Sequence, residues 1–140
     1  MEAISTDFSI YVTIMNQVTN DFIIVSQSNN HGTYNPQSLP TTIIHKDQIS
    51  FTLQGSILTG SEGKVTYEEE GTGKRITFAF KCPRIDNNSL SIPLNNTSCD
   101  ITYYGSNQFI EWNPHGTNWG PSNNFPKRGH PLHALFVISS

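Results

Sequence analysis

Apolar and polar residues alternate along most of this chain with a period of two. The clearest alternation covers residues 8–14, 49–54, 64–68, 76–81 and 89–94. This period is typical of β-strands that bury one face. Further strand candidates, with weaker alternation, are residues 21–27, 41–45, 100–104, 108–112 and 133–139. No stretch has a convincing helical period, although residues 92–107 leave room for one short helix. About ten short strands with polar turns favour an all-β fold, either a β-sandwich or a closed barrel.

Residues 58–83, LTGSEGKVTYEEEGTGKRITFAFKCP, hold two alternating runs joined by Gly71 and Gly73. Glycine tolerates positive φ, so this segment predicts a β-hairpin. Its core-facing residues would be Val65, Tyr67, Ile76, Phe78 and Phe80. The flanking loops, residues 60–63 and 81–88, would emerge at the sheet ends, where a rigid scaffold displays binding residues. We interpret Glu68, Glu69 and Glu70 as a solvated approach to the turn.

Length and composition narrow the class of protein. The 140 residues favour one domain, residues 1–140, and only 14% of them are charged. The net charge is −3 and the eight Lys and Arg residues are scattered, which argues against nucleic-acid binding. The N-terminus carries an acid and an interrupted apolar run, so we expect soluble synthesis in the cytosol without a signal peptide. Action outside the cell after release stays open. Two buried thiols at Cys82 and Cys99 are favoured over a disulfide.

Several short motifs then follow one another in the order of a known family. Residues Thr59, Gly60, Gly63 and Tyr67 form T-G-x-x-G-x-x-x-Y, and the next strand ends F-x-x-P at Pro83 before an Asn-rich loop. This resembles the central hairpin of the actinoporins, the sea-anemone cytolysins. Gly32-Thr33, Leu39-Pro40, Tyr103-Tyr104-Gly105, Arg128-Gly129 and His133-Ala134 occur in the same family order. The resemblance implies a single-domain antiparallel β-sandwich of about ten strands.

Two related families share parts of this pattern. Fungal fruit-body lectins, which have the actinoporin fold, resemble the chain in the Gly-Thr loop, the Tyr-Tyr pair and the closing strand PLHALFVI. The aegerolysins, lipid-binding β-sandwich proteins, resemble it in the strand end F-x-C-P.

The resemblance also implies a binding site. By position, the phosphocholine site of actinoporins corresponds to His31 and Gly32 as loop-edge contacts, Lys81 as a charge and Pro83 as a wall. Tyr103 and Tyr104 correspond to its stacking surface, where a ring could hold a cation or a sugar. If their strand is regular, the two tyrosines face opposite sides, so one of them packs in the core.

The chain also departs from the family. It starts almost directly in its first strand, where actinoporins carry the amphipathic helix that lines the pore. Where the family has an aromatic loop that faces the membrane, this chain has the polar sequence DNNS at residues 86–89, and the family's Arg-Gly-Asp motif is missing. The His-Asn sugar-binding motif of the fungal lectins is missing as well. These departures favour binding over lysis.

Residues 113–131 form the longest stretch without a strand pattern, and Trp112 and Trp119 lie beside or within it. Loops of this length in a small domain are often functional. An aromatic ring among Asn side chains suits a sugar or a membrane interface. A core position for at least one of these tryptophans is the alternative.

Metal binding and enzymatic catalysis have weaker support in the sequence. His130 and His133 could bind a metal with His115, but no carboxylate accompanies them, so we expect no metal site and no cofactor. Glycoside hydrolysis would need two carboxylates across a cleft, for example Asp86 with Asp100 or Glu111. The chain has no G-x-S-x-G and no phosphate-binding loop. We therefore expect no enzymatic activity.

These observations predict a non-enzymatic, lectin-like recognition module. It would bind a glycan or a lipid headgroup at cell surfaces through loops at one end of a β-sandwich. The alternative is a cytolysin of the sphingomyelin-binding type, or a component of a pore-forming toxin. A homo-oligomer would raise avidity for repeated ligands, although the sequence shows no interface.

Overall fold

The computed structural model describes residues 7–106 and 129–140, and these residues form ten β-strands. The strands are β1 (Ile10–Asn16), β2 (Phe22–His31), β3 (Thr33–Asn35), β4 (Thr42–Ile43), β5 (Gln48–Gln54), β6 (Ser61–Glu69), β7 (Arg75–Cys82), β8 (Ser89–Asn95), β9 (Asp100–Ser106) and β10 (Leu132–Ser139). Within the described part, the region considered for a short helix is strand or turn up to Ser106. No helix in the described residues is long and apolar enough to span a membrane.

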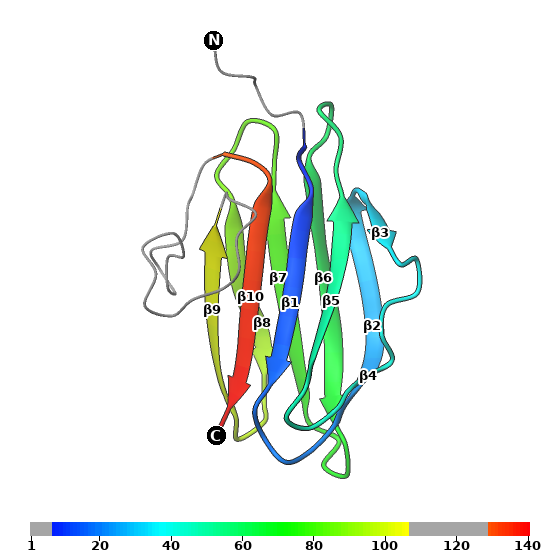
Figure 1. Ribbon diagram of the computed structural model, residues 1–140, viewed down its shortest axis with the longest axis vertical. Coiled ribbons are helices and arrows are strands. Elements are labelled where there is room, and N and C mark those ends of the chain that lie inside the picture. Colours follow the sequence, from blue (N-terminus) through cyan, green and yellow to red (C-terminus); the bar gives the residue numbers. More distant parts are fainter. Residues whose placement is uncertain (1–6, 107–128) are drawn as a thin grey trace.

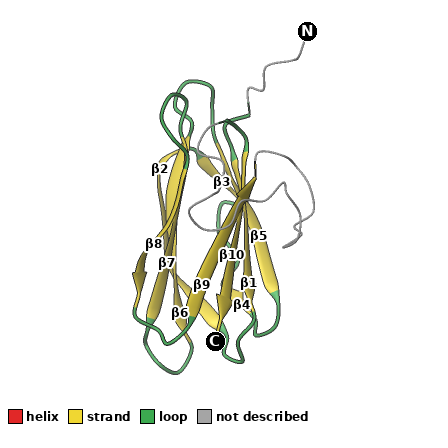
Figure 2. Cartoon of the chain, turned by 90° about the vertical axis from the view of Figure 1, so that its left-hand side faces the viewer, coloured by secondary structure: helices red, strands yellow, loops and turns green. Residues whose placement is uncertain are grey.

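The strands form two sheets of five that pack face to face (Figures 1 and 2). Sheet A has the order β3-β5-β1-β10-β9, and sheet B has the order β4-β2-β6-β7-β8. The predicted all-β sandwich is confirmed. Among the described strands, every neighbouring pair is antiparallel except β1 and β10, which run parallel in the middle of sheet A.

The predicted central hairpin consists of β6 and β7. Val65 lies opposite Phe78, and Tyr67 lies opposite Ile76. The turn contains two glycines with positive φ, at 82° for Gly71 and 71° for Gly73. The hairpin prediction is therefore confirmed, including the side chains that it turns into the core.

Aromatic rings from both sheets fill the space between them. Phe78 of β7 meets Phe136 of β10 with ring centroids 5.1 Å apart, and Phe80 meets Phe51 of β5 at 6.0 Å. Both are edge-on or tilted contacts, which aromatic pairs favour over a face-to-face sandwich. These contacts join β7 of sheet B to β5 and β10 of sheet A across the core.

The far end of the hairpin differs from the prediction. Glu69 is only 6% exposed, so the interpretation of this residue as solvated is wrong. It continues the inward alternation of Val65 and Tyr67, and its carboxylate accepts hydrogen bonds from Asn20 Nδ2 at 3.3 Å and Cys99 Sγ at 3.7 Å. Cys99 and Cys82 are both free and buried, as favoured from the sequence.

Candidate functional site: the apolar tip and the polar hollow

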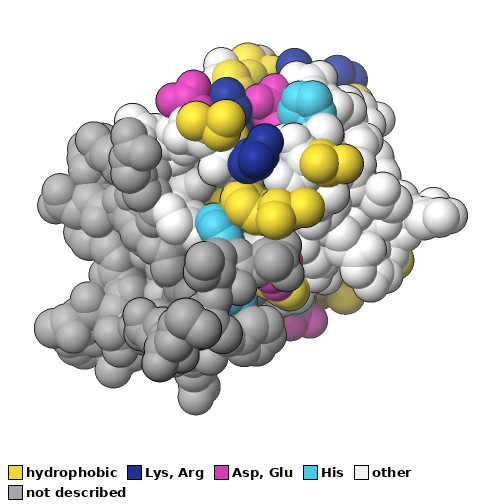
Figure 3. Space-filling view, turned by 90° about the horizontal axis from the view of Figure 1, so that it is seen from above, with side chains coloured by type: hydrophobic (Ala, Val, Ile, Leu, Met, Phe, Trp, Pro, Cys, Tyr) yellow, Lys and Arg dark blue, Asp and Glu magenta, His cyan; other side chains and the backbone are white. Residues whose placement is uncertain are grey.

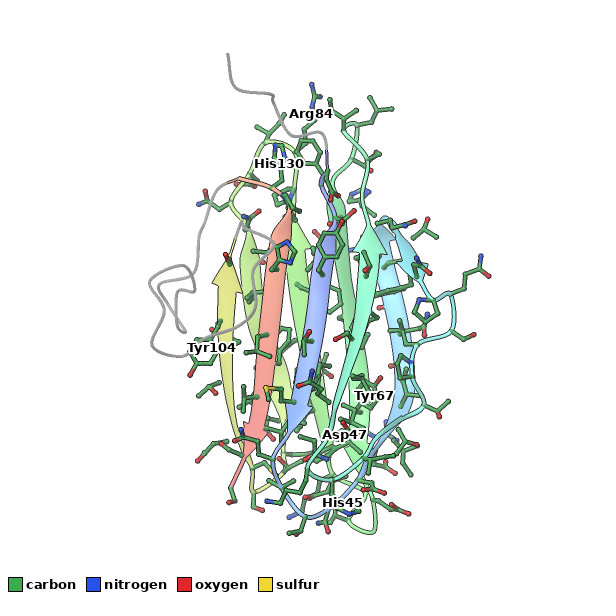
Figure 4. All side chains as sticks on the ribbon, in the orientation of Figure 1. His45, Asp47, Tyr67, Arg84, Tyr104 and His130 are labelled. Atoms are coloured by element: carbon green, nitrogen blue, oxygen red, sulfur yellow. The ribbon has the colours of Figure 1, made fainter. Side chains whose placement is uncertain are left out.

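One end of the sandwich carries exposed aliphatic side chains. Leu58 and Ile85 are each 77% exposed, and Ile57 is 51% exposed. They lie on two neighbouring loops, one between β5 and β6 and one between β7 and β8. Arg84 reaches out from the same end, which is uppermost in Figure 4, and Figure 3 shows apolar side chains there together with basic and acidic ones. We call Ile57, Leu58, Arg84 and Ile85 the apolar tip.

A serine-centred turn holds the first tip loop in shape. Ser56 Oγ accepts hydrogen bonds from the backbone N–H groups of Leu58 at 3.2 Å and Thr59 at 3.3 Å. The carbonyl of Ser56 accepts a further bond from Gly60 N at 2.8 Å. Serine commonly stabilises turns through such local bonds. These local hydrogen bonds fix the backbone of the turn, and the side chains of Ile57 and Leu58 are left exposed on its outside.

The two tip loops touch through Gly60. This residue has φ of 71°, and a Cβ atom there would lie 2.5 Å from the Cys82 carbonyl oxygen and 2.8 Å from Pro83 Cα. Only glycine permits both this φ and this close approach without strain. The second loop is also fixed from its other side, since Asn88 Nδ2 donates to the carbonyl of Gly129 at 2.9 Å. The tip is thus one surface built on two loops.

Stacked rings and short hydrogen bonds support the tip from below. Phe8 stacks on His130 with centroids 3.8 Å apart, and Tyr11 stacks on His133 at 4.7 Å. Tyr11 OH donates to Asp7 at 2.6 Å. This hydrogen bond, together with burial, raises the pKa of Tyr11. Burial alone would raise the pKa of the Asp7 carboxyl, but hydrogen bonds from Tyr11 and Ser9 outweigh it, so that pKa is lowered.

Burial lowers the pKa of His133 below its ordinary value of 6.5, although the nearby charge of Asp7 opposes this. As the pH falls below 6.5, His133 therefore takes up a proton more readily in the unfolded state than in the folded state. The free energy of unfolding should fall as the pH drops from 6.5 towards 5. A His133→Phe variant keeps a ring against Tyr11 and should show a flatter dependence. Urea unfolding at pH 7, 6 and 5 measures this, and equal slopes for both proteins would contradict it.

A row of polar residues crosses sheet B directly beside the tip. Glu62 of β6 lies opposite His31 of β2 on one side and Lys81 of β7 on the other, and Lys81 lies opposite Ser89 of β8. Lys81 Nζ is 3.4 Å from Glu62 Oε1. The Asn30 amide donates to the other carboxylate oxygen. The Asn30 bond and the Lys81 charge hold the pKa of Glu62 below its usual range, so this carboxylate stays ionised near neutral pH.

This row borders a hollow of about 290 Å³ on the outer face of sheet B. Its lining is mostly polar and comprises Ser28, Asn29, Asn30, Glu62, Gly63, Lys64, Ala79, Phe80, Lys81 and Ser89. Ala79 points outward from β7, between the inward-facing Phe78 and Phe80. Its small side chain leaves space between the long side chains of Lys64 and Lys81. We call this feature the polar hollow.

The structure brings together four of the residues expected from the family resemblance. His31 and Lys81 belong to the row beside the polar hollow, Gly32 follows His31 with φ of 99°, and Pro83 begins the second tip loop. Tyr103 and Tyr104 lie elsewhere, on β9 of sheet A.

The two tyrosines face different sides of their sheet. Tyr103 packs inward, with its ring centroid 6.1 Å from that of Phe136. Tyr104 points away from the sandwich interior (Figure 4). Neither tyrosine lines the polar hollow, so any stacking by Tyr104 would take place on a different surface from the contacts of Lys81.

The remaining candidates from the sequence are the tryptophans of the long loop, a pair of carboxylates and a set of metal ligands. Trp112 and Trp119, together with His115 and Glu111, lie outside the described residues. Asp86 lies in the second tip loop and Asp100 begins β9 at the opposite end of the sandwich (Figure 1), so this pair cannot face across one cleft. Within residues 7–106 and 129–140, no three His, Cys, Asp or Glu side chains converge as a metal site would require.

The sequence reasoning missed Glu62 and most of the tip. Glu62 takes its partners Asn30 and Lys81 from two other strands, and only the strand register reveals them. The sequence did place residues 81–88 at a sheet end. The aliphatic Ile85, next to Arg84 in that otherwise polar loop, was the available signal for an exposed apolar surface.

No family model and no curated protein sequence matches this chain. Solved structures do match it, and they define its class as a β-sandwich consistent with the actinoporin-like fold. One is the lipid-binding protein Nakanori, with a TM-score of 0.65, 11% identity, and coverage of 99% of this chain and 73% of that chain. Another is the RahU protein in complex with a TRIS molecule, with a TM-score of 0.59, 12% identity, and coverage of 94% and 96%. At these identities the likeness concerns the fold.

Proposed function

We propose that this protein is a non-enzymatic module that binds the surface of lipid bilayers through its apolar tip. The observation that carries the proposal is the exposure of Leu58, Ile85 and Ile57 on two fixed, adjoining loops at one end of the sandwich. Exposed aliphatic side chains scattered singly are normal on proteins, but a cluster beside polar groups marks an interaction surface. Arg84 in the same cluster suits contact with phosphate groups of lipids.

The free energy gained by inserting the apolar tip into a membrane is sufficient for reversible binding. Complete burial of one Leu or Ile side chain contributes roughly 1.5–3 kcal/mol. Because the three side chains are already partly buried, their insertion would contribute about 3–6 kcal/mol in total. Arg84 would add about 1 kcal/mol at a membrane with anionic lipids. Such a tip would bind membranes reversibly and would not cross them.

A lipid surface is favoured over a protein partner by the shape and the fold. The aliphatic residues stand at the narrow end of the sandwich, where they would insert between lipid headgroups without burying the polar sheet faces (Figure 3). The matching structure of Nakanori is that of a lipid-binding protein. The same fold therefore supports lipid binding elsewhere, which adds support to the proposal.

Co-sedimentation with vesicles tests this function. The full chain is mixed with vesicles of phosphatidylcholine, alone or with phosphatidylserine or sphingomyelin, each loaded with a self-quenched dye. We expect sedimentation with vesicles, stronger with phosphatidylserine, and no dye release. Release on binding would favour the cytolysin alternative. The absence of sedimentation with all three compositions would refute the proposal.

A further inference from the structure

The polar hollow lies next to the apolar tip but belongs to a different surface, the outer face of sheet B. Lys81 precedes Arg84 by three residues, which span at most about 10 Å of chain. The polar layer on each side of a bilayer is roughly 5–8 Å thick. When the tip enters the bilayer, the hollow therefore stands at the outer edge of the headgroups. A group that projects from a lipid headgroup would reach it.

The charges that line the hollow are largely compensated. Lys81 and Glu62 form an ion pair, and Glu62 is also bonded to Asn30. A phosphate or sulfate placed beside Lys81 would lie within a few ångströms of the Glu62 carboxylate, which repels it. The remaining cation, Lys64, is exposed and its charge is screened by salt. The lining thus disfavours anions.

A quaternary ammonium group fits no better. Such ligands are held over the faces of aromatic rings. Phe80 is the one aromatic residue among the lining residues, and its side chain is 1% exposed because it points into the core. The hollow presents no aromatic face to a choline group.

The hydrogen-bonding groups of the lining match a neutral, hydroxyl-rich ligand. The amides of Asn29 and Asn30 donate to Gly32 O and to Glu62, and within the described residues their side-chain oxygens take no hydrogen bond. Lys81 donates, Glu62 accepts, and Ser28 and Ser89 can do both. Sugar hydroxyl groups also donate and accept. Two neighbouring hydroxyl groups of a sugar could bind the Glu62 carboxylate and the Lys81 ammonium without breaking their ion pair.

We infer that the polar hollow binds a neutral saccharide, presented by a glycolipid of the membrane that the tip contacts. The membrane source of the sugar depends on the function proposed above, whereas the chemistry of the hollow does not. A volume of about 290 Å³ is at the small end of ligand sites, so one or two sugar units fill it. Glu62 and Lys81 orient the sugar, and Ala79 forms the floor.

A glycan array tests the hollow without any lipid. The labelled full chain is applied to printed neutral, sialylated and sulfated saccharides. We expect retention on at least one neutral saccharide. Retention on acidic saccharides alone, or on none, would overturn the inference.

Two variants locate this binding, and one controls for it. Ala79→Ile fills the floor with a residue that suits an outward strand position, and Glu62→Gln removes the carboxylate charge. Each should lower array binding by about tenfold or more, because Ala79→Ile occupies the space of the sugar and Glu62→Gln weakens its charge-assisted hydrogen bonds. Glu68→Gln is the matched control, since Glu68 lies on the same strand and forms a similar ion pair with Arg75 at 3.1 Å. Array binding that survives both Ala79→Ile and Glu62→Gln would overturn the inference.

Vesicles separate the two possible sources of the sugar and the two proposals. Phosphatidylcholine vesicles that contain a glycolipid with the retained saccharide should sediment more protein than phosphatidylcholine alone. Equal sedimentation would refute the glycolipid source. Binding to the array but to no vesicle would contradict the membrane function and support the saccharide site in the hollow. Binding to vesicles without retention on the array would contradict the saccharide site and support the membrane function.

Discussion

Replacing both Leu58 and Ile85 with Asp should reduce the affinity for vesicles by at least about 100-fold. The two side chains are each 77% exposed, so the folded protein loses little packing when they change. At the membrane, the change removes about 3 kcal/mol of apolar burial and adds two charges that resist dehydration. A loss of about 2.7 kcal/mol already corresponds to 100-fold in affinity. Co-sedimentation over a range of lipid concentrations measures the effect.

The chain offers a closely matched control for the position of the charge. Ile57 at the tip is 51% exposed, and Ile44 at the opposite end of the sandwich is 50% exposed. Ile57→Asp should weaken vesicle binding roughly tenfold, whereas Ile44→Asp should leave it unchanged. Equal losses in these two variants would show that net charge, rather than insertion of the tip, determines binding.

Gly60→Ala should destabilise the fold by about 2–5 kcal/mol, which is a large part of the stability of a domain of this size. About 1–2 kcal/mol comes from a side chain at positive φ. The rest comes from the contact of the new Cβ with the backbone of Cys82 and Pro83, which cannot move without shifting the second tip loop. Urea unfolding gives the value.

Gly73→Ala isolates the contribution of that contact. Gly73 has the same φ of 71° as Gly60, but a Cβ there would meet nothing within 4 Å. We expect a cost of only about 1–2 kcal/mol for this variant. The difference between the two substitutions measures how tightly the tip loops are joined, and similar losses would mean that they are not rigidly coupled.

The sequence predicted those parts of the fold that depend on local pattern. Alternation located the β6–β7 hairpin, because an inward and an outward face repeat every two residues. It could not reveal that β1 pairs with β10, since that pairing joins residues from the two ends of the chain. Glu69 was misjudged because three consecutive glutamates look like a polar turn, while the strand carries the second of them into the interior.

The candidate site could be predicted only in part, because its contacts also join residues that are distant in the sequence. Lys81 was named from a resemblance, but its interaction with Glu62 depends on how β6 and β7 are aligned. Tyr104 was grouped with Lys81 because the two correspond to one site in a family. Here they belong to different sheets, and no local sequence signal indicates this separation.

The parallel pairing of β1 and β10 affects how the protein is made. β10 lies between β1 and β9, and among the described strands it comes last in the sequence (Figure 1). Until it emerges from the ribosome, β1 and β9 have no partner between them, and sheet A is split. Contacts so distant in sequence also slow folding. Sheet A can therefore close only after β10 has been translated, and the apolar tip gains its full support from residues 129–133 at that same stage.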